Sequence, residues 1–138
     1  MVFIKIYWRT LIAVVIVFLL SVINFSPVPA EIPAFTYNDK IAHILMYAFL
    51  TFILALDYHR DTVHKGKHSL FYIALILFPF IYGAAIEYIQ ERFFSPRTAE
   101  FLDWVADVLG IFLGVGAAAL WIRKKNKKNQ EKNFNPTK

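Results

Sequence analysis

Four long apolar segments, separated by short polar or proline-containing breaks, make up most of the chain. They cover residues 4–25, 39–57, 69–90 and 101–122. Each has about the 20 mostly apolar residues that a helix needs to cross a bilayer, where the backbone must satisfy its own hydrogen bonds. The pattern therefore predicts four membrane-spanning helices.

The breaks between these segments carry residues that end helices. Pro33 is the last of three prolines in the first break, Gly66 lies among charges in the second, and Pro96 follows a serine in the third. Because short connections join antiparallel neighbours, the expected fold class is all-α, an integral membrane four-helix up-down bundle within residues 1–122. We expect the basic tail, residues 123–138, to be disordered.

Composition agrees with a membrane location. Hydrophobic residues make up 58% of the 138 positions, above the roughly 45–50% usual in soluble domains. The chain has no cysteine, which excludes disulfides, a thiolate nucleophile and cysteine-ligated metal clusters. Its net charge of +5 comes largely from a basic tail behind an apolar core, which is typical of a topology signal, so we expect no nucleic-acid partner.

Basic residues are distributed unequally between the two sides of the predicted bundle. Twelve of the 15 Lys and Arg residues fall on the side of the chain termini, and the other three are Lys40, Arg92 and Arg97. Since cytoplasmic loops are enriched in Lys and Arg, this asymmetry predicts that both termini are cytoplasmic.

The first apolar segment has a second interpretation. Lys5 and Arg9, the apolar stretch after them, and the small residue Ala30 would also suit a cleavable signal peptide. An apolar run that starts at Val2 is long for such a peptide, which favours a retained helix.

Polar residues recur at helical spacing at the same ends of the last three segments. Residues spaced three or four apart share one face of a helix. A charge at mid-membrane costs about 2.5–3.5 kcal/mol on insertion scales, so these faces should turn inward and form a polar cavity that opens outward. The candidate ligand-binding residues are Asp39, Lys40, His43, Tyr47, Glu87, Gln90, Arg97, Asp103 and Asp107.

Small residues accompany these polar faces. Gly110 and Gly114 continue the face of Asp103 and Asp107, and two glycines at this spacing let another helix backbone approach closely. Gly83, one turn before Glu87, is expected to help helix packing in the third segment.

Taken together, these motifs resemble the VanZ-like membrane proteins. The matching elements are Asp39-Lys40-x-x-His43-x-x-x-Tyr47, Gly83-x-x-x-Glu87-x-x-Gln90, Arg97 and Asp103-x-x-x-Asp107-x-x-Gly110-x-x-x-Gly114. The resemblance implies a bacterial inner-membrane protein, and the namesake of the family is associated with reduced susceptibility to teicoplanin. This chain departs from the family at Asp107, where an asparagine is usual.

A binding role follows from the number of ionisable groups. Interhelical polar contacts average only about 0.6 kcal/mol, and holding four helices together does not require this many charges. Arg97, Lys40 and a protonated His43 would suit the phosphate or carboxylate of an envelope lipid, a lipid-linked intermediate or a lipophilic glycopeptide. Acidic residues outnumber basic ones, however, so the cavity attracts cations unless Glu87 or Asp107 is neutral.

Two other interpretations stay open. In the first, the polar residues form a salt-bridge network that only joins helices. In the second, they form the centre of a membrane hydrolase or transferase in which His43 acts as general base and Arg97 stabilises an oxyanion. One histidine with carboxylates on three helices is a weak metal signature, so no metal and no cofactor is assigned. The expected partners are membrane lipids. The sequence has no internal repeat of the kind that transporters contain, and a homo-oligomer such as a homodimer would supply that symmetry.

Overall fold

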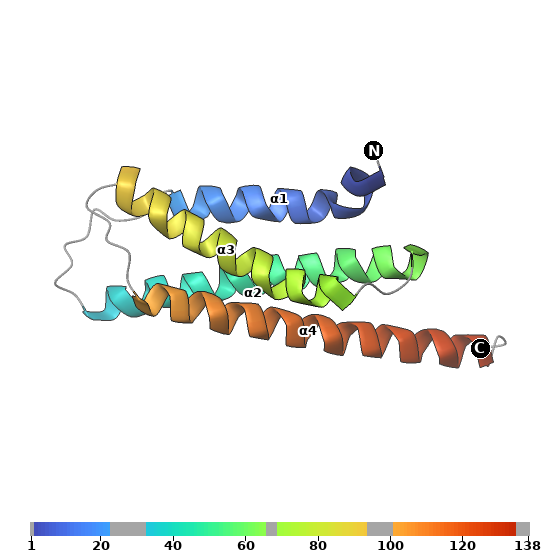
Figure 1. Cartoon of the computed structure of the whole chain (residues 1–138). Coiled ribbons are helices and arrows are strands. Elements are labelled where there is room, and N and C mark those ends of the chain that lie inside the picture. The colour runs from blue at the N-terminus through green and yellow to red at the C-terminus, as the bar shows by residue number, and fades with distance from the viewer. Residues whose placement is uncertain (1, 23–32, 66–68, 94–100, 135–138) are drawn as a thin grey trace.

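The computed structural model is entirely helical over the residues that it describes, which are 2–22, 33–65, 69–93 and 101–134. These segments form α1 (Val2–Val22), α2 (Pro33–Lys65), α3 (Ser69–Phe93) and α4 (Phe101–Phe134). The predicted all-α four-helix bundle is confirmed, and consecutive helices run in opposite directions (Figure 1). The start of α1 and the end of α4 consequently lie at the same end of the bundle (Figure 1).

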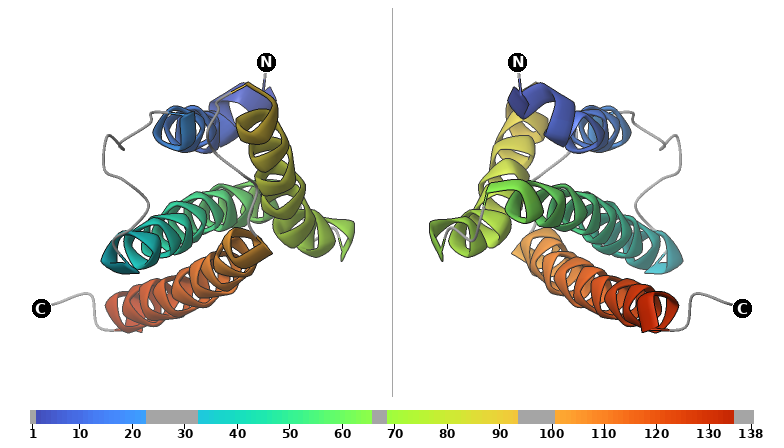
Figure 2. Two further views of the ribbon diagram at one scale, coloured as in Figure 1. Left: turned by 90° about the vertical axis from the view of Figure 1, so that its left-hand side faces the viewer. Right: turned by 90° about the vertical axis from the view of Figure 1, so that its right-hand side faces the viewer.

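The second helix is the centre of the arrangement. It lies between α1 and α4, and α3 crosses this stack obliquely (Figure 1, Figure 2). The most extensive helix–helix interface joins α2 to α4, and the next joins α1 to α2. Polar residues on α2 can therefore reach all three other helices, because each of them packs against it.

Glycines allow the close approach of α4 to α2. A Cβ atom added at Gly110 would lie 2.5 Å from the carbonyl oxygen of Ile44, and one added at Gly114 would lie 2.5 Å from that of Ala48. Both distances are far inside van der Waals contact, so the two backbones could not pack at this separation with any larger residue. The small-residue face continues to Ala118, which is also buried.

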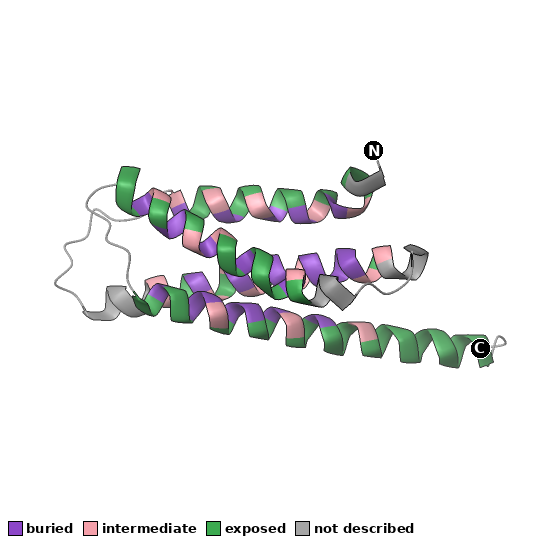
Figure 3. Cartoon of the chain, viewed as in Figure 1, coloured by how far each residue is buried: buried purple, intermediate pink, exposed green. Residues whose placement is uncertain are grey.

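The outer surface of the bundle is apolar. Each of the four helices contains a stretch long and hydrophobic enough to cross a membrane: Ile4–Val22, Asp39–Asp61, Ile73–Phe93 and a part of Phe101–Phe134. Large hydrophobic side chains such as Leu45, Ile81 and Phe112 are exposed on this surface, and Figure 3 shows exposed positions along the outside of every helix. Lipid tails are the environment that suits such a surface, and the chain is a multi-pass membrane protein.

The boundaries of α2 differ from those expected from hydropathy. The helix is longer at both ends than residues 39–57, and it begins at Pro33, which was expected in a loop. A proline in the first turn of a helix costs no intrahelical hydrogen bond, because the N–H that it lacks would have no partner there. Proline at this position starts a helix rather than interrupting one.

The tail is the second difference. We expect disorder from residue 123, but α4 continues as a helix to Phe134. Residues 123–134 contain Lys, Arg, Gln and Glu, which favour helix, and no Gly or Pro. Lys127 Nζ and Glu131 Oε1 are 4.0 Å apart, one helical turn from each other. The extension needs no tertiary support because it propagates from a helix that already exists.

Candidate functional site

Three helices bring ionisable side chains together at the end of the bundle where α2 and α4 begin and α3 ends. We call this group the His43 cluster. It consists of Asp39, Lys40 and His43 from α2, Glu87 from α3, and Asp103 and Asp107 from α4. All six were candidate binding residues in the sequence, and the close α2–α4 packing explains why they meet.

His43 is the centre of the cluster. Its side chain is 2% exposed, and its Nδ1 atom lies 2.9 Å from Asp107 Oδ1, within hydrogen-bond distance, and 4.0 Å from Glu87 Oε1. Tyr47, one turn further along α2, stacks its ring nearly parallel to the imidazole, with 6.4 Å between the ring centroids. Imidazole and carboxylates from three helices are thus held in one buried group.

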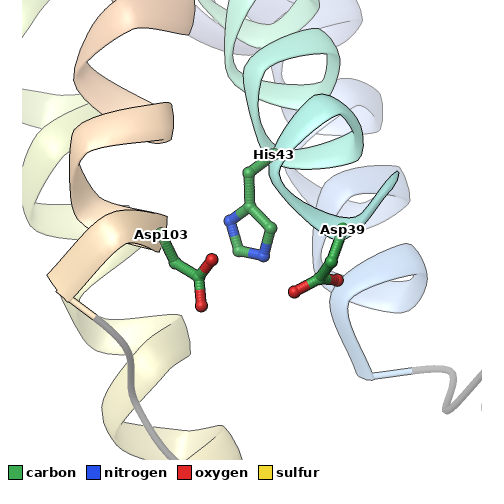
Figure 4. A group of neighbouring side chains, drawn as sticks. All are labelled: Asp39, His43 and Asp103. Atoms are coloured by element: carbon green, nitrogen blue, oxygen red, sulfur yellow. The ribbon is translucent and has the colours of Figure 1, made fainter. Parts of the chain in front are cut away.

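A second layer lies nearer to the end of the bundle. Lys40 donates to Asp103 in an ion pair between α2 and α4. Asp39 and Asp103 approach the imidazole of His43 from different sides (Figure 4), and one ligand atom from each of the three residues lies within 4.8 Å of the others. This layer is less enclosed than the inner one, since Asp39 and Lys40 are only partly buried.

Gly83 makes room for the inner layer. A Cβ atom on this residue would lie 2.7 Å from Asp107 Oδ2 and 3.1 Å from the hydroxyl oxygen of Tyr47. The carboxyl group and the phenol therefore occupy the space that any side chain at position 83 would need. In the sequence Gly83 was a packing residue, and in the structure it borders the site.

Other candidate residues lie apart from the cluster. Gln90 is buried, but its Nε2 atom donates to the backbone carbonyl of Ser21 at 2.6 Å, so it joins α3 to α1. Glu91 and Arg92, which follow Gln90 in α3, are exposed. Arg97, a candidate ligand-binding residue in the sequence, is outside the residues that the structure describes.

A second polar group, which sequence reasoning missed, lies at the opposite end of the bundle. Asp57 of α2 is fully buried and accepts hydrogen bonds from Arg9 Nε at 2.8 Å, from Arg9 Nη2, and from the hydroxyl and backbone N–H of Thr10 at 2.9 and 3.1 Å. The hydroxyl of Tyr7 donates to Asp61 at 3.2 Å. These contacts hold α1 against α2.

The sequence did contain a signal for this pair. Arg9 lies inside the first apolar segment and Asp57 at the end of the second, so two opposite charges occur at matching depths of antiparallel neighbours. In the sequence Arg9 was considered only for the orientation and for a possible signal peptide. Charges within apolar segments usually need partners, which makes the pairing predictable in retrospect.

Comparison with protein-family models, with curated proteins and with solved structures finds no match to this chain. The VanZ-like resemblance rests on the residue motifs alone.

Proposed function

We propose that this chain is a VanZ-like protein of a bacterial inner membrane. In this proposal the His43 cluster faces the extracytoplasmic side and binds the polar headgroup of an envelope lipid or a lipophilic glycopeptide. The observation that carries the proposal is the convergence of six ionisable residues from three helices at one end of an apolar bundle. Such a concentration of charge exceeds what helix association requires.

The orientation is supported by the distribution of basic residues. Lys5 and Arg9 in the first half of α1 and Arg60 near the end of α2 lie toward the end opposite to the His43 cluster, where the basic extension of α4, residues 123–134, also projects (Figure 1). Under the positive-inside rule this end is cytoplasmic. The His43 cluster is then at the outer leaflet, where envelope lipids expose their headgroups.

The charge of the cluster favours one class of headgroup. It contains four carboxyl groups, whereas Lys40 and His43 are its only basic members, and both are already engaged by Asp103 and Asp107. A ligand with a primary amine would complement this excess of carboxyl groups over basic groups. We therefore favour a zwitterionic, amine-bearing headgroup over a purely anionic one.

Binding to short-chain lipids tests the proposal. The full chain in detergent with EDTA is titrated with dihexanoyl phosphatidylethanolamine, dihexanoyl phosphatidylglycerol and teicoplanin, and binding is followed by microscale thermophoresis. We expect binding of the phosphatidylethanolamine or teicoplanin, and a loss of about tenfold or more in Asp39→Asn and Glu87→Gln, since each removes a charge from the site.

Glu91→Gln is the matched control, because it removes an exposed carboxylate of α3 outside the cluster. Equal binding of both lipids, or binding that Asp39→Asn and Glu87→Gln leave unchanged, would contradict the proposed site. Monodisperse elution of each variant shows that the bundle is intact.

One observation favours a second candidate function, a membrane hydrolase or transferase. The 2.9 Å contact between His43 Nδ1 and Asp107 Oδ1 is the arrangement by which a carboxylate orients a general base. Turnover of a lipid-linked phosphate substrate, abolished by His43→Gln while lipid binding persists, would support catalysis instead of recognition alone.

A further inference from the structure

From the inner layer of the His43 cluster we infer that His43, Glu87 and Asp107 form a binding site for a divalent transition-metal cation such as Zn²⁺ or Mn²⁺. One ligand atom from each of the three residues lies within 4.8 Å of the others. The inference rests on the geometry of these three side chains and does not require the proposed lipid ligand.

Two of the three distances between ligand atoms fit a single ion. Zn–N and Zn–O bonds are about 2.0–2.2 Å long, so two ligand atoms of one ion can be separated by up to about 4.2 Å. His43 Nδ1 lies 2.9 Å from Asp107 Oδ1 and 4.0 Å from Glu87 Oε1. The ligand atoms of Glu87 and Asp107 lie within 4.8 Å of each other, and side-chain rotations that bring them within about 4.2 Å would complete the site.

The burial of the three residues distinguishes this group from a solvated acidic patch. His43, Glu87 and Asp107 are 2%, 4% and 3% exposed, and they come from three different helices. A neutral imidazole with two carboxylates carries two negative charges, which a divalent cation balances. Two carboxylates packed this closely in a membrane interior are costly, and a divalent cation bound between them would lower that cost.

Gly83 provides an independent indication that the inner layer is a built site. The absence of a side chain at this position leaves space for Asp107 Oδ2 and the hydroxyl of Tyr47, which would lie 2.7 and 3.1 Å from a Cβ atom there. Glycine in a helix interior costs roughly 0.5–1 kcal/mol relative to alanine. The glycine thus weakens α3 slightly but leaves room for the carboxyl group of Asp107 beside the imidazole of His43.

The outer layer is a poorer site for a cation. Asp39, His43 and Asp103 also bring ligand atoms within 4.8 Å of one another, but Asp103 already accepts a hydrogen bond from the ammonium group of Lys40. That positive charge would repel a metal ion in the same place. The chemistry of one nitrogen and carboxylate oxygens suits Zn²⁺ or Mn²⁺ better than Mg²⁺ or Ca²⁺, which prefer oxygen ligands alone.

Metal titration of the full chain tests the inference. The protein is purified in detergent, treated with EDTA, dialysed into lipid-free buffer and titrated with ZnCl₂ or MnCl₂ by isothermal calorimetry, with MgCl₂ as comparison. We expect one tight site per chain for Zn²⁺ or Mn²⁺ and a rise in the thermal unfolding temperature. Asp107→Asn and Glu87→Gln should each weaken binding by at least about tenfold, since even the outer partners of metal ligands have effects of that size.

Glu91→Gln and His64→Gln are the matched controls, one for an exposed carboxylate on α3 and one for a histidine outside the cluster. No tight binding by the wild-type chain, or binding that only His64→Gln weakens, would overturn the inference. If a cluster variant fails to fold, zinc X-ray absorption of the wild-type chain decides. One imidazole with oxygen ligands supports the site, whereas two imidazoles require a histidine other than His43 and contradict it.

Because the metal titration contains no lipid and the lipid titration contains EDTA, the two proposals fail separately. Metal binding without a lipid ligand would leave the present inference intact. Lipid binding without a metal would leave only the proposed function.

Discussion

At the scale of single residues, two buried carboxylates serve different purposes. Asp57 accepts four hydrogen bonds from Arg9 and Thr10, and these bonds join α1 to α2. Within the described part of the chain, Asp107 has one hydrogen-bonding neighbour, His43, and Glu87 lies only 4.0 Å from the same nitrogen. The first carboxylate is bonded to an arginine and a threonine, whereas the second lies beside a histidine that also has a second carboxylate nearby.

The Arg9–Asp57 contact makes a prediction about stability. Arg9→Met should lower the free energy of unfolding by about 3–5 kcal/mol, because it removes the cation that is hydrogen-bonded to a buried carboxylate. Adding Asp57→Asn to that variant should recover a large part of the loss, since the amide can still accept from Thr10. Unfolding by SDS titration in mixed micelles measures both values.

Arg60 offers the matched control for this experiment. It lies 3.9 Å from Asp57 but is largely exposed, so Arg60→Met should cost no more than about 1 kcal/mol. Equal effects of Arg9→Met and Arg60→Met would show that the buried pair does not stabilise the bundle.

Helical spacing explains which of the candidate residues lie together in the structure, whereas their role as ligands stays a prediction. Asp39 and His43 on α2 and Asp103 and Asp107 on α4 share faces because residues one turn apart do so in any helix, and inward orientation follows from the cost of charge in lipid. Which partner each residue finds depends on the rotation of neighbouring helices, which hydropathy does not encode. Gln90 therefore turned out to bond α1, although it lies one turn from Glu87.

At the scale of helices, the α2–α4 interface depends on glycines that face a backbone. Gly114→Val should destabilise the bundle by about 1–3 kcal/mol or prevent its assembly, since a Cβ atom there would be 2.5 Å from the carbonyl oxygen of Ala48. Gly116→Val is the control, because no atom lies within 4 Å of a Cβ atom at that position.

Thermal unfolding in detergent, followed by circular dichroism, distinguishes these two variants. Similar unfolding temperatures for Gly114→Val and Gly116→Val would mean that the close α2–α4 contact is absent in the membrane protein. A selective loss in Gly114→Val would also be expected to weaken the His43 cluster, since α2 and α4 both contribute to it.

The number and type of helices could be predicted from the sequence, but their boundaries could not. Apolar length fixes the four spans because lipid imposes a minimum length on each. Apolar length gives no information about helix that continues beyond the membrane, so the sequence did not predict the start of α2 at Pro33 or the extension of α4 to Phe134. Those parts depend on helix propensity and N-terminal geometry, which act outside the membrane.

At the scale of the whole molecule, α1 is integrated into the bundle by contacts from both ends. Asp57 and Asp61 bond to its first half, Tyr82 donates to the carbonyl of Val14 at 2.6 Å, and Gln90 donates to that of Ser21. Removal of α1 would leave these groups without the partners it provides, inside lipid. The packing therefore argues against α1 as a cleaved signal peptide.

The mass of the protein isolated from membranes checks the prediction that α1 is retained. We expect peptides from α1 to be recovered with the rest of the chain, and an antibody to a tag placed before Met1 to detect the membrane-embedded form. A mature protein that begins after Ala30 would contradict it, and the Asp57 group would then need another source of compensation.

The last prediction concerns which side of the membrane each end of the bundle faces. Because the chain contains no cysteine, single cysteines can be introduced without a background signal. Thr98 lies between α3 and α4 in the sequence, and Asn129 is exposed on the extension of α4. A membrane-impermeant maleimide should label Thr98→Cys in intact spheroplasts and Asn129→Cys only after permeabilisation, because the basic extension is expected in the cytoplasm. Labelling of both after permeabilisation shows that each thiol is accessible. The reverse pattern would place the His43 cluster at the cytoplasmic leaflet, where it could not meet ligands of the outer envelope.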